Sequence, residues 1–225
     1  MSSITGRTNL AMVIGDPIRH SLSPTLHNAA FSAAGLDWVY VACPVPLGGA
    51  AQAVHAMRTL GIGGMSVTMP HKQGVAEAVD VLAPEAAALG AVNCVRRDGD
   101  RRSGENTDGP GLVRSIRDGL GFARAGRVGL GIGAGGAARA AIKSLADAGA
   151  VVQVANRTTA TAYEAAALAG PSGSVVAVDA AVDAELVVQA TSLGMTSDDA
   201  LPVDPARIGA GQILVDLIYH PVETP

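Results

Sequence analysis

Apolar positions along the chain fall into two kinds of run that alternate. Short runs that are apolar at nearly every position are typical of buried parallel strands, whereas longer stretches with apolar residues three and four apart are typical of helices. In the first half, strands are predicted at residues 10–14, 39–45, 64–68 and 91–95, and helices at residues 24–34, 49–60 and 72–81. This alternation predicts an α/β unit whose strands pair mainly in parallel.

A hairpin is predicted where the first unit ends. Asp98-Gly99-Asp100 is flanked by the arginine pairs 96–97 and 101–102. An Asp-Gly pair suits a type I′ turn, and arginines interleaved with acids indicate solvent-exposed flanks. We therefore expect an antiparallel hairpin at the edge of the sheet.

The second half carries its own series of apolar runs, which predict strands at residues 128–132, 151–155, 175–178, 186–190 and 213–217. The first of them passes through the glycine cluster 133–137 directly into an alanine-rich helix at 137–148. Glycine permits a tight turn with close backbone approach, and the helix N-terminus offers unpaired N–H groups to a phosphate. The segment predicts the pyrophosphate turn of a Rossmann unit, with an ordinary glycine-rich turn as the alternative.

The next strand bears on which dinucleotide would bind. An NAD-selective fold usually places an acid at the end of this strand, where it holds the ribose 2′-hydroxyl. Here the strand is followed by Asn156-Arg157-Thr158. An arginine can pair with a 2′-phosphate, so the sequence favours NADP. The alternative is a solvated arginine.

The position of the glycine turn divides the chain into two predicted domains, 1–107 and 108–225. The chain ends at Pro225 without a closing helix after the fifth strand of the second unit. We expect a truncated chain, while a naturally short variant and an omitted tail stay open as alternatives.

Composition narrows the class of protein further. The 225 residues are 48% hydrophobic and 16% charged, with a net charge of −4, which disfavours a nucleic-acid partner. No run is long and apolar enough for a signal peptide or a membrane span, so the cytoplasm is expected. Cys43 and Cys94 indicate small buried thiols of a reducing compartment. The five histidines show no metal-ligand spacing, and no metal is expected.

Candidate chemistry lies in the first unit and at the junction. Ser21 and Ser23 precede a helix, where hydroxyls and backbone N–H groups can hold a carboxylate, although the same pattern is common in helix caps. Lys72 opens a helix, where the dipole opposes its charge and favours proton transfer, unless it is an ordinary surface lysine. Asp108 follows Asn106-Thr107 at the predicted hinge and could pair with a lysine, yet this composition also suits a turn.

The ordered series of motifs decides between these alternatives. It runs through Ser-x-Ser-Pro (21–24), Ser-Val-Thr-Met-Pro-His-Lys (66–72), Gly-Ala-Val-Asn (90–93), Asn-Thr-Asp-Gly (106–109), the glycine turn, Asn-Arg-Thr (156–158), Ala-Thr-Ser-Leu-Gly-Met (190–195) and Asp-x-x-Tyr-x-Pro-x-x-Thr-Pro (216–225). Over essentially its whole length the chain resembles the shikimate dehydrogenase family. The resemblance implies NADP-dependent interconversion of 3-dehydroshikimate and shikimate, in the chorismate pathway of aromatic amino-acid biosynthesis, and leaves monomer and homodimer both open.

The resemblance also implies roles for individual residues. Lys72 and Asp108 would be the catalytic pair. The substrate would be bound by Ser21, Ser23, Thr68, Lys72, Asn93, Asp108 and Tyr219. The cofactor would be bound by Gly133, Ala134, Gly135, Gly136, Ala137, Asn156, Arg157, Thr158 and Leu217.

Three departures from the family pattern qualify these expectations. Ser66 stands where the family usually has asparagine, which weakens the assignment of the substrate. No second basic residue stands around Ala160, so NAD is the expected second choice of cofactor. The C-terminal helices that the family carries beyond the final Thr-Pro, one with a substrate-binding glutamine, are missing from this sequence.

Two alternative functions remain at this point. The same scaffold could oxidise quinate or an amino-substituted shikimate. The chain could instead be a nucleotide- or metabolite-binding module without turnover, an alternative motivated by the missing C-terminal segment.

Overall fold

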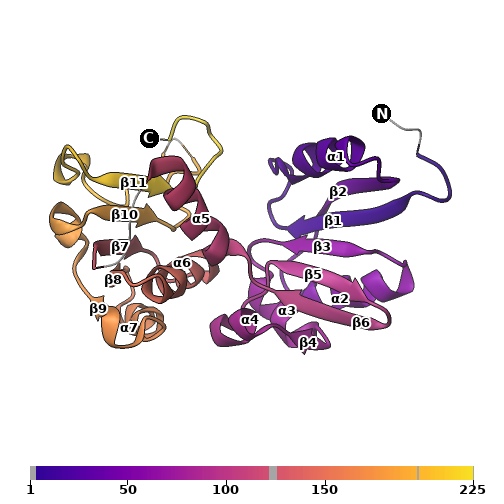
Figure 1. Ribbon diagram of the computed structural model, residues 1–225, viewed down its shortest axis with the longest axis horizontal. Coiled ribbons are helices and arrows are strands. Elements are labelled where there is room, and N and C mark those ends of the chain that lie inside the picture. The colour runs from indigo at the N-terminus through magenta and orange to yellow at the C-terminus, as the bar shows by residue number, and fades with distance from the viewer. Residues whose placement is uncertain (1–3, 122–125, 197, 225) are drawn as a thin grey trace. The chain divides into compact units, whose positions relative to one another are not determined.

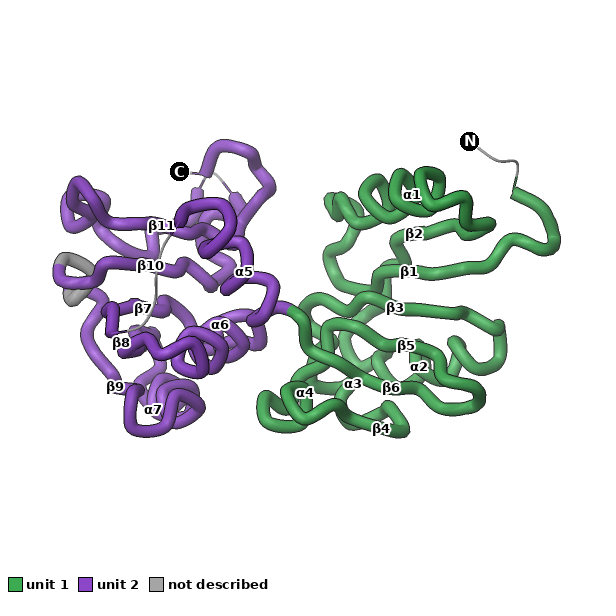
Figure 2. The backbone as a smooth tube through the Cα atoms, in the orientation of Figure 1, with its two compact units in different colours: residues 1–107 green, residues 108–225 purple. Residues whose placement is uncertain are grey.

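The computed structural model describes residues 4–121, 126–196 and 198–224. The chain divides into two compact units, unit 1 with residues 1–107 and unit 2 with residues 108–225 (Figure 2). Pro225, where the expected truncation falls, lies outside the described residues.

Unit 1 is built on a six-stranded mixed sheet with strand order β2-β1-β3-β5-β6-β4 (Figure 1). Its elements are β1 (Asn9–Gly15), α1 (Ser23–Ala33), β2 (Trp38–Pro44), α2 (Ala50–Thr59), β3 (Gly64–Val67), α3 (Lys72–Ala78), β4 (Val81–Leu82), α4 (Pro84–Leu89), β5 (Cys94–Asp98) and β6 (Arg101–Glu105). Strand β1 pairs in parallel with β2 and β3, whereas β5 pairs antiparallel to β3 and to β6. The predicted alternation of strands and helices is confirmed for this part of the chain.

Local details of unit 1 differ from the sequence expectation. The helix predicted at 72–81 ends at Ala78, because Val79 is extended and leads into the short strand β4. The strand predicted at 91–95 begins only at Cys94. The β5–β6 hairpin is not the sheet edge, since β4 pairs in parallel outside β6.

The hairpin turn and one of its arginines also differ. Gly99 has φ +58° and no non-glycine residue among those described has a positive φ, so the central pair Gly99-Asp100 follows a type II′ pattern and not type I′. Arg102 is buried, and its backbone N–H donates to the carboxylate of Asp80 at 2.6 Å. The prediction of solvated flanks is therefore wrong for Arg102, which lies inward on the alternating face of β6.

The sheet of unit 1 has an apolar cluster on each face. The larger one gathers side chains from α2, α3 and α4, among them Met57, Val75 and Ala86. The smaller one lies between the sheet and α1, where Tyr40 packs with Ala11, Val13 and Ile18, and Phe31 and Trp38 lie against this cluster with ring centroids 5.7 Å apart. This second face carries the polar residues described below.

Unit 2 is a five-stranded parallel sheet with strand order β11-β10-β7-β8-β9 (Figure 1). Its elements are α5 (Asp108–Leu120), β7 (Val128–Ile132), α6 (Gly136–Asp147), β8 (Val151–Ala155), α7 (Thr159–Ala167), the 3-10 turn η1 (Gly170–Ser172), β9 (Gly173–Val175), the 3-10 helix η2 (Val178–Asp183), β10 (Leu186–Gln189), the 3-10 turn η3 (Pro205–Arg207) and β11 (Ile213–Asp216). Apolar clusters cover both faces of this sheet. The predicted Rossmann-like unit is confirmed.

Two features of unit 2 were not expected from the sequence. The strand predicted at 175–178 lies earlier, at Gly173–Val175, and Val178 opens a 3-10 helix. Helix α5 packs so closely on α6 that a Cβ added at Gly109 would lie 2.5 Å from the carbonyl oxygen of Ala140. Within the described residues, no helix combines the length and hydropathy needed to cross a membrane.

Candidate functional site

The glycine turn joins the carboxyl end of β7 to the start of α6. Gly133 has φ +116°, and a Cβ there would lie 3.0 Å from the carbonyl oxygen of Ala190 and 3.2 Å from Cγ2 of Thr191. Its N–H donates to the carbonyl of Ala155 at 2.9 Å, which fixes the turn against β8. The backbone conformation and the close neighbours both require glycine here.

The remaining turn residues lead into the helix. Ala134 and Gly135 precede α6, Gly136 is its first residue and Ala137 its second. Gly135 caps the helix without a side-chain hydrogen bond, so no side chain occupies the first N–H groups of this 12-residue helix. Unpaired N–H groups at the positive end of a helix dipole favour a bound phosphate, as the sequence predicted.

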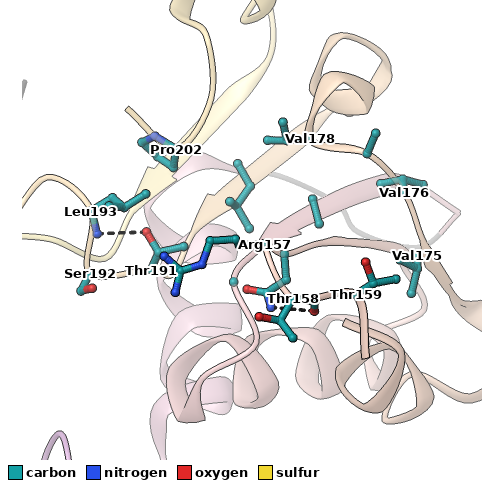
Figure 3. Close-up of a pocket in the computed structure, with 15 residues that line it drawn as sticks. Arg157, Thr158, Thr159, Val175, Val176, Val178, Thr191, Ser192, Leu193 and Pro202 are labelled. Atoms are coloured by element: carbon teal, nitrogen blue, oxygen red, sulfur yellow. Dashed lines mark hydrogen bonds between the residues drawn. The ribbon is translucent and has the colours of Figure 1, made fainter. Parts of the chain in front are cut away.

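Beside this turn lies a cavity with a volume of about 760 Å³. It is formed entirely by unit 2, and Figure 3 shows an apolar group of three valines and a polar group that includes Thr191 and Ser192. The lining residues are Ile132, Gly133, Ala155, Asn156, Arg157, Thr158, Thr159, Val175, Val176, Ala177, Val178, Thr191, Ser192, Leu193 and Pro202. A cavity of this size with apolar walls and a few polar groups is typical of a small-molecule or cofactor site.

The charge of this cavity comes from a single side chain. Among the lining residues that the structure describes, Arg157 is the one charged group, and no carboxylate stands beside it. Asn156 is held in place, because its amide donates to the carbonyl of Thr158 at 3.0 Å and to the hydroxyl of Thr161 at 2.8 Å. A cation without a neighbouring acid fits the 2′-phosphate of NADP better than the free ribose hydroxyls of NAD.

Four of the predicted cofactor residues line the cavity, namely Gly133, Asn156, Arg157 and Thr158. Leu217 does not; its N–H extends the sheet by donating to the carbonyl of Gln189 at 3.0 Å, and its side chain packs on the larger core of unit 2. The cavity is also lined by Thr191, Ser192 and Leu193, which were not expected from the sequence. The motif at 190–195 was the signal that could have located them.

In unit 1, Ser21 and Ser23 stand at the start of α1. The hydroxyl oxygen of Ser21 accepts the N–H of Ser23 at 3.2 Å, and the helix cap is Leu22, which makes no side-chain hydrogen bond to the helix. The Ser21 hydroxyl therefore satisfies the first N–H of α1, as the helix-cap alternative expects, while no cap bond is made by the side chain of Ser23. Both hydroxyls lie at a helix N-terminus, where a carboxylate is favoured.

Thr68 and Lys72 lie where β3 passes into α3. The N–H of Thr68 donates to the carbonyl of Ile14 at 3.0 Å, and the carbonyl of Thr68 accepts from the N–H of His71 at 3.0 Å. The buried ring of His71 lies with Nε2 2.7 Å from the carbonyl of Val45. Lys72 is the first residue of α3 and is half-buried. This network fixes the backbone on both sides of the lysine.

Asn93 is anchored to the end of unit 1. Its side-chain oxygen accepts the N–H of Thr107 at 2.9 Å, and its amide donates to the Thr107 hydroxyl at 3.0 Å. Asp108 follows as the first residue of α5 and of unit 2. Tyr219 lies in unit 2 beyond β11 and is about half exposed.

Neither cysteine has the features of a reactive thiol. Both are free and partly buried. Burial raises the pKa of Cys43, and burial together with the charge of Glu105 raises the pKa of Cys94. A raised pKa leaves little thiolate at neutral pH.

Unit 2 is a Rossmann-like unit with a glycine phosphate turn and a cavity suited to a 2′-phosphate. Unit 1 is a separate α/β unit that carries hydroxyl, amide and amine side chains. This combination defines the class of two-domain nicotinamide-dependent dehydrogenases. Comparison with known proteins gives the family. A family profile described as "Shikimate dehydrogenase substrate binding domain" matches residues 13–95. A shikimate dehydrogenase (NADP(+)) of Geobacter metallireducens is 44% identical, over 99% of this chain and 82% of its own.

Solved structures agree with the sequence comparison. A shikimate dehydrogenase crystallised with NADP+ superposes with a TM-score of 0.91 at 32% identity, covering 99% of this chain and 81% of its own. The shikimate 5-dehydrogenase of Thermus thermophilus, in complex with NADP(H) and shikimate, gives a TM-score of 0.87 at 33% identity, over 95% of this chain and 80% of its own. The chain belongs to the shikimate dehydrogenase family, which confirms the resemblance found in its motifs.

Proposed function

We propose that this protein catalyses the reversible, NADP-dependent reduction of 3-dehydroshikimate to shikimate in aromatic amino-acid biosynthesis. The observation that carries the proposal is the cavity of unit 2, where Arg157 is the one charged lining residue described and Gly133 holds the phosphate turn. Family membership supports the substrate. Two points stay predictions: that the protein lies in the reducing cytoplasm, which the two free thiols suggest, and that it has no nucleic-acid partner.

Different parts of the cofactor are assigned to different residues of unit 2. We assign the adenosine 2′-phosphate to Arg157, with Asn156 and Thr158 beside it. The pyrophosphate belongs at the turn that comprises Gly133, Ala134, Gly135, Gly136 and Ala137, and Leu217 lies near the nicotinamide in this assignment. NADPH, when bound, supplies the hydride that reduces the ketone carbon.

The substrate residues of unit 1 have complementary tasks. Ser21 and Ser23 hold the carboxylate with hydroxyl and backbone N–H donors at the start of α1. Thr68 and Asn93 bind ring hydroxyls, and the contacts of Asn93 with Thr107 keep its amide in one orientation. Tyr219 completes the substrate contacts from unit 2.

Proton transfer is assigned to Lys72 and Asp108. Reduction of the ketone places negative charge on its oxygen, and Lys72 Nζ donates the proton that neutralises it. In the oxidation direction the same amine takes the proton from the hydroxyl. We assign to Asp108 the role of orienting this amine, as the second member of the catalytic pair.

The test is NADPH oxidation with 3-dehydroshikimate as substrate, in a protein of verified mass. The chain has two lysines, so Lys143→Ala is a matched control for Lys72→Ala. Lys143 is half-buried on α6, as Lys72 is on α3, and pairs with Asp147 at 2.9 Å. We expect Lys72→Ala to lower kcat by roughly 100-fold or more, the range of general acid–base catalysis, and Lys143→Ala to retain activity.

Other substrates are distinguished in the same assay. If quinate or an amino-substituted shikimate is turned over in preference to shikimate, that compound is the substrate and the proposed reaction is wrong, although the protein remains an enzyme of this family. Binding of NADPH without turnover of any of these compounds would indicate a binding module instead of an enzyme.

A further inference from the structure

The face of unit 1 beneath α1 contains a buried tyrosine that has no role in the proposed mechanism. Tyr40 of β2 is 4% exposed, and its phenol donates to the hydroxyl of Ser66 at 2.6 Å. Its ring is stacked on that of His27, with centroids 4.1 Å apart and planes inclined by 10°. Its backbone N–H and carbonyl both bond to the side chain of Asn28, each at 2.9 Å. Tyr40 is thus fixed by its backbone, its ring face and its hydroxyl.

The stacked histidine connects this tyrosine to the start of α1. Nδ1 of His27 lies 2.9 Å from the carbonyl oxygen of Ser23. Ser23 is one of the two residues assigned to the substrate carboxylate. A continuous series of contacts therefore runs from Ser23 through His27 and Tyr40 to Ser66, entirely within unit 1.

Ser66 lies in β3, and Thr68 follows one residue beyond the end of that strand, where its N–H still donates to the carbonyl of Ile14 in β1 at 3.0 Å. Side chains alternate along a strand, so residues 66 and 68 point to one side and Met65 and Val67 to the other. The burial pattern agrees, since Met65 and Val67 are buried in the opposite core while Ser66 and Thr68 are half-buried. The Ser66 hydroxyl thus shares its side of the sheet with the proposed substrate contact of Thr68.

The hydrogen atoms of this pair can be assigned from chemistry. A phenol is a stronger acid than a serine hydroxyl, so Tyr40 is the donor. Burial raises the pKa of Tyr40 above its ordinary 10.0, although the bonds to Ser66 partly oppose this effect, so the phenol keeps its proton at neutral pH. Ser66 then has its own hydrogen to donate, and within the described part of the chain no other side chain or carbonyl accepts it. A hydroxyl that accepts one bond also becomes a better donor in the next.

We propose that Tyr40 is a positioning residue that fixes Ser66 as a hydrogen-bond donor to a keto or hydroxyl oxygen of the substrate ring. This inference rests on the proposed function, because it takes the substrate to lie on the Thr68 side of the sheet.

The experiment compares Tyr40→Phe, Ser66→Ala and the double variant, with KM measured separately for 3-dehydroshikimate and for NADPH. Phenylalanine keeps the ring that stacks on His27 and removes only the phenol oxygen. Tyr163→Phe is the matched control, since Tyr163 is exposed on α7 in unit 2. Thermal unfolding of each variant reports on folding, and shikimate binding measured by calorimetry gives a readout independent of turnover.

We expect each single variant to raise KM for 3-dehydroshikimate by about 3- to 10-fold, the value of one hydrogen bond. KM for NADPH should not change, and the double variant should be no worse than Ser66→Ala, because Tyr40 acts through Ser66. Ser66→Thr keeps a hydroxyl at this position, so its KM for 3-dehydroshikimate should lie much closer to that of the parent than to that of Ser66→Ala.

Several results would overturn the inference while leaving the proposed function intact. These are an unchanged KM in Ser66→Ala, effects of the two single variants that add in the double variant, and a loss in Tyr40→Phe that follows its thermal stability alone. Ser66→Ala decides the matter if Tyr40→Phe fails to fold. A wild-type protein that neither turns over 3-dehydroshikimate nor binds shikimate would instead refute the proposed function, and the inference with it.

Discussion

The contact between α5 and α6 makes a strong prediction about Gly109. Replacing it with alanine adds a Cβ 2.5 Å from the carbonyl oxygen of Ala140 and 2.9 Å from Cβ of Ser144. The Ser144 hydroxyl can rotate away, but the backbone oxygen of Ala140 cannot. The two helices must therefore separate, and α5 carries Asp108 as its first residue.

The magnitude follows from two opposing terms. Overpacking of this kind costs about 1–3 kcal/mol, while alanine in place of glycine in a helix returns about 0.5–1 kcal/mol. Gly109→Ala should therefore lose up to about 2.5 kcal/mol, which lowers Tm by about 2–4 °C for each kcal/mol lost in a protein of this size. Gly111→Ala is the matched control, because it lies in the same helix with no heavy atom within 4 Å of an added Cβ.

The assay is thermal unfolding followed by circular dichroism, with kcat measured on both variants at a temperature where each is folded. We expect Gly109→Ala to be less stable and slower, since Asp108 is displaced, and Gly111→Ala to be about 0.5–1 kcal/mol more stable than the parent. Equal stability of the two variants would refute the argument from helix contact.

Three further predictions concern the cofactor, acid stability and the thiols. Arg157→Gln should raise KM for NADPH by roughly 10-fold or more, the value of a charge-assisted bond, and leave KM for NADH unchanged; parallel losses with both cofactors would contradict this assignment. The bond from the N–H of Arg102, and then the Arg58 guanidinium, hold the pKa of Asp80 below its ordinary 3.8, so its stabilising effect is present at neutral pH and lost as the pH falls through the lowered pKa. Asp80→Asn should accordingly melt earlier than the parent at neutral pH, with the difference closing in acid. Alkylation of Cys94 by iodoacetamide should be slow at neutral pH and accelerate up to and beyond pH 9.0, because burial raises the pKa of this thiol; fast reaction at neutral pH would show that the thiol is activated.

The fold could be predicted because most strands of both units are continuous apolar runs, which mark buried strands whatever their partners, while the polar strand β6 was indicated by the Asp-Gly turn before it. Their ends could not be located as well. The apolar pattern around Val79 does not show whether this residue is helical or extended. Its extended conformation follows from the pairing of β4 with β6, a contact between segments distant in sequence. The same pairing explains why the hairpin is not an edge and why Arg102 is buried.

The candidate site was predictable where function depends on backbone geometry. Gly133 is required by its positive φ and by the proximity of Ala190, and such constraints appear in the sequence as glycine. Thr191 and Ser192 line the same cavity because the chain returns there after β10; the motif at 190–195 marks these residues in the sequence, but their place beside the cavity depends on the order of strands in the sheet. The contact between Tyr40 and Ser66 joins two strands that are not neighbours in the sheet, so only the structure could show it.

The single tryptophan, Trp38, lies in unit 1 against Phe31 of α1, and the nucleotide cavity belongs to unit 2. Indole emission overlaps the absorption of reduced nicotinamide, so Trp38 and a bound NADPH are spectrally matched for resonance energy transfer. The protein thus contains a natural donor, and its cofactor is the matching acceptor. Without any added label, the efficiency of transfer would measure the separation of the two units in solution and its change when substrate binds.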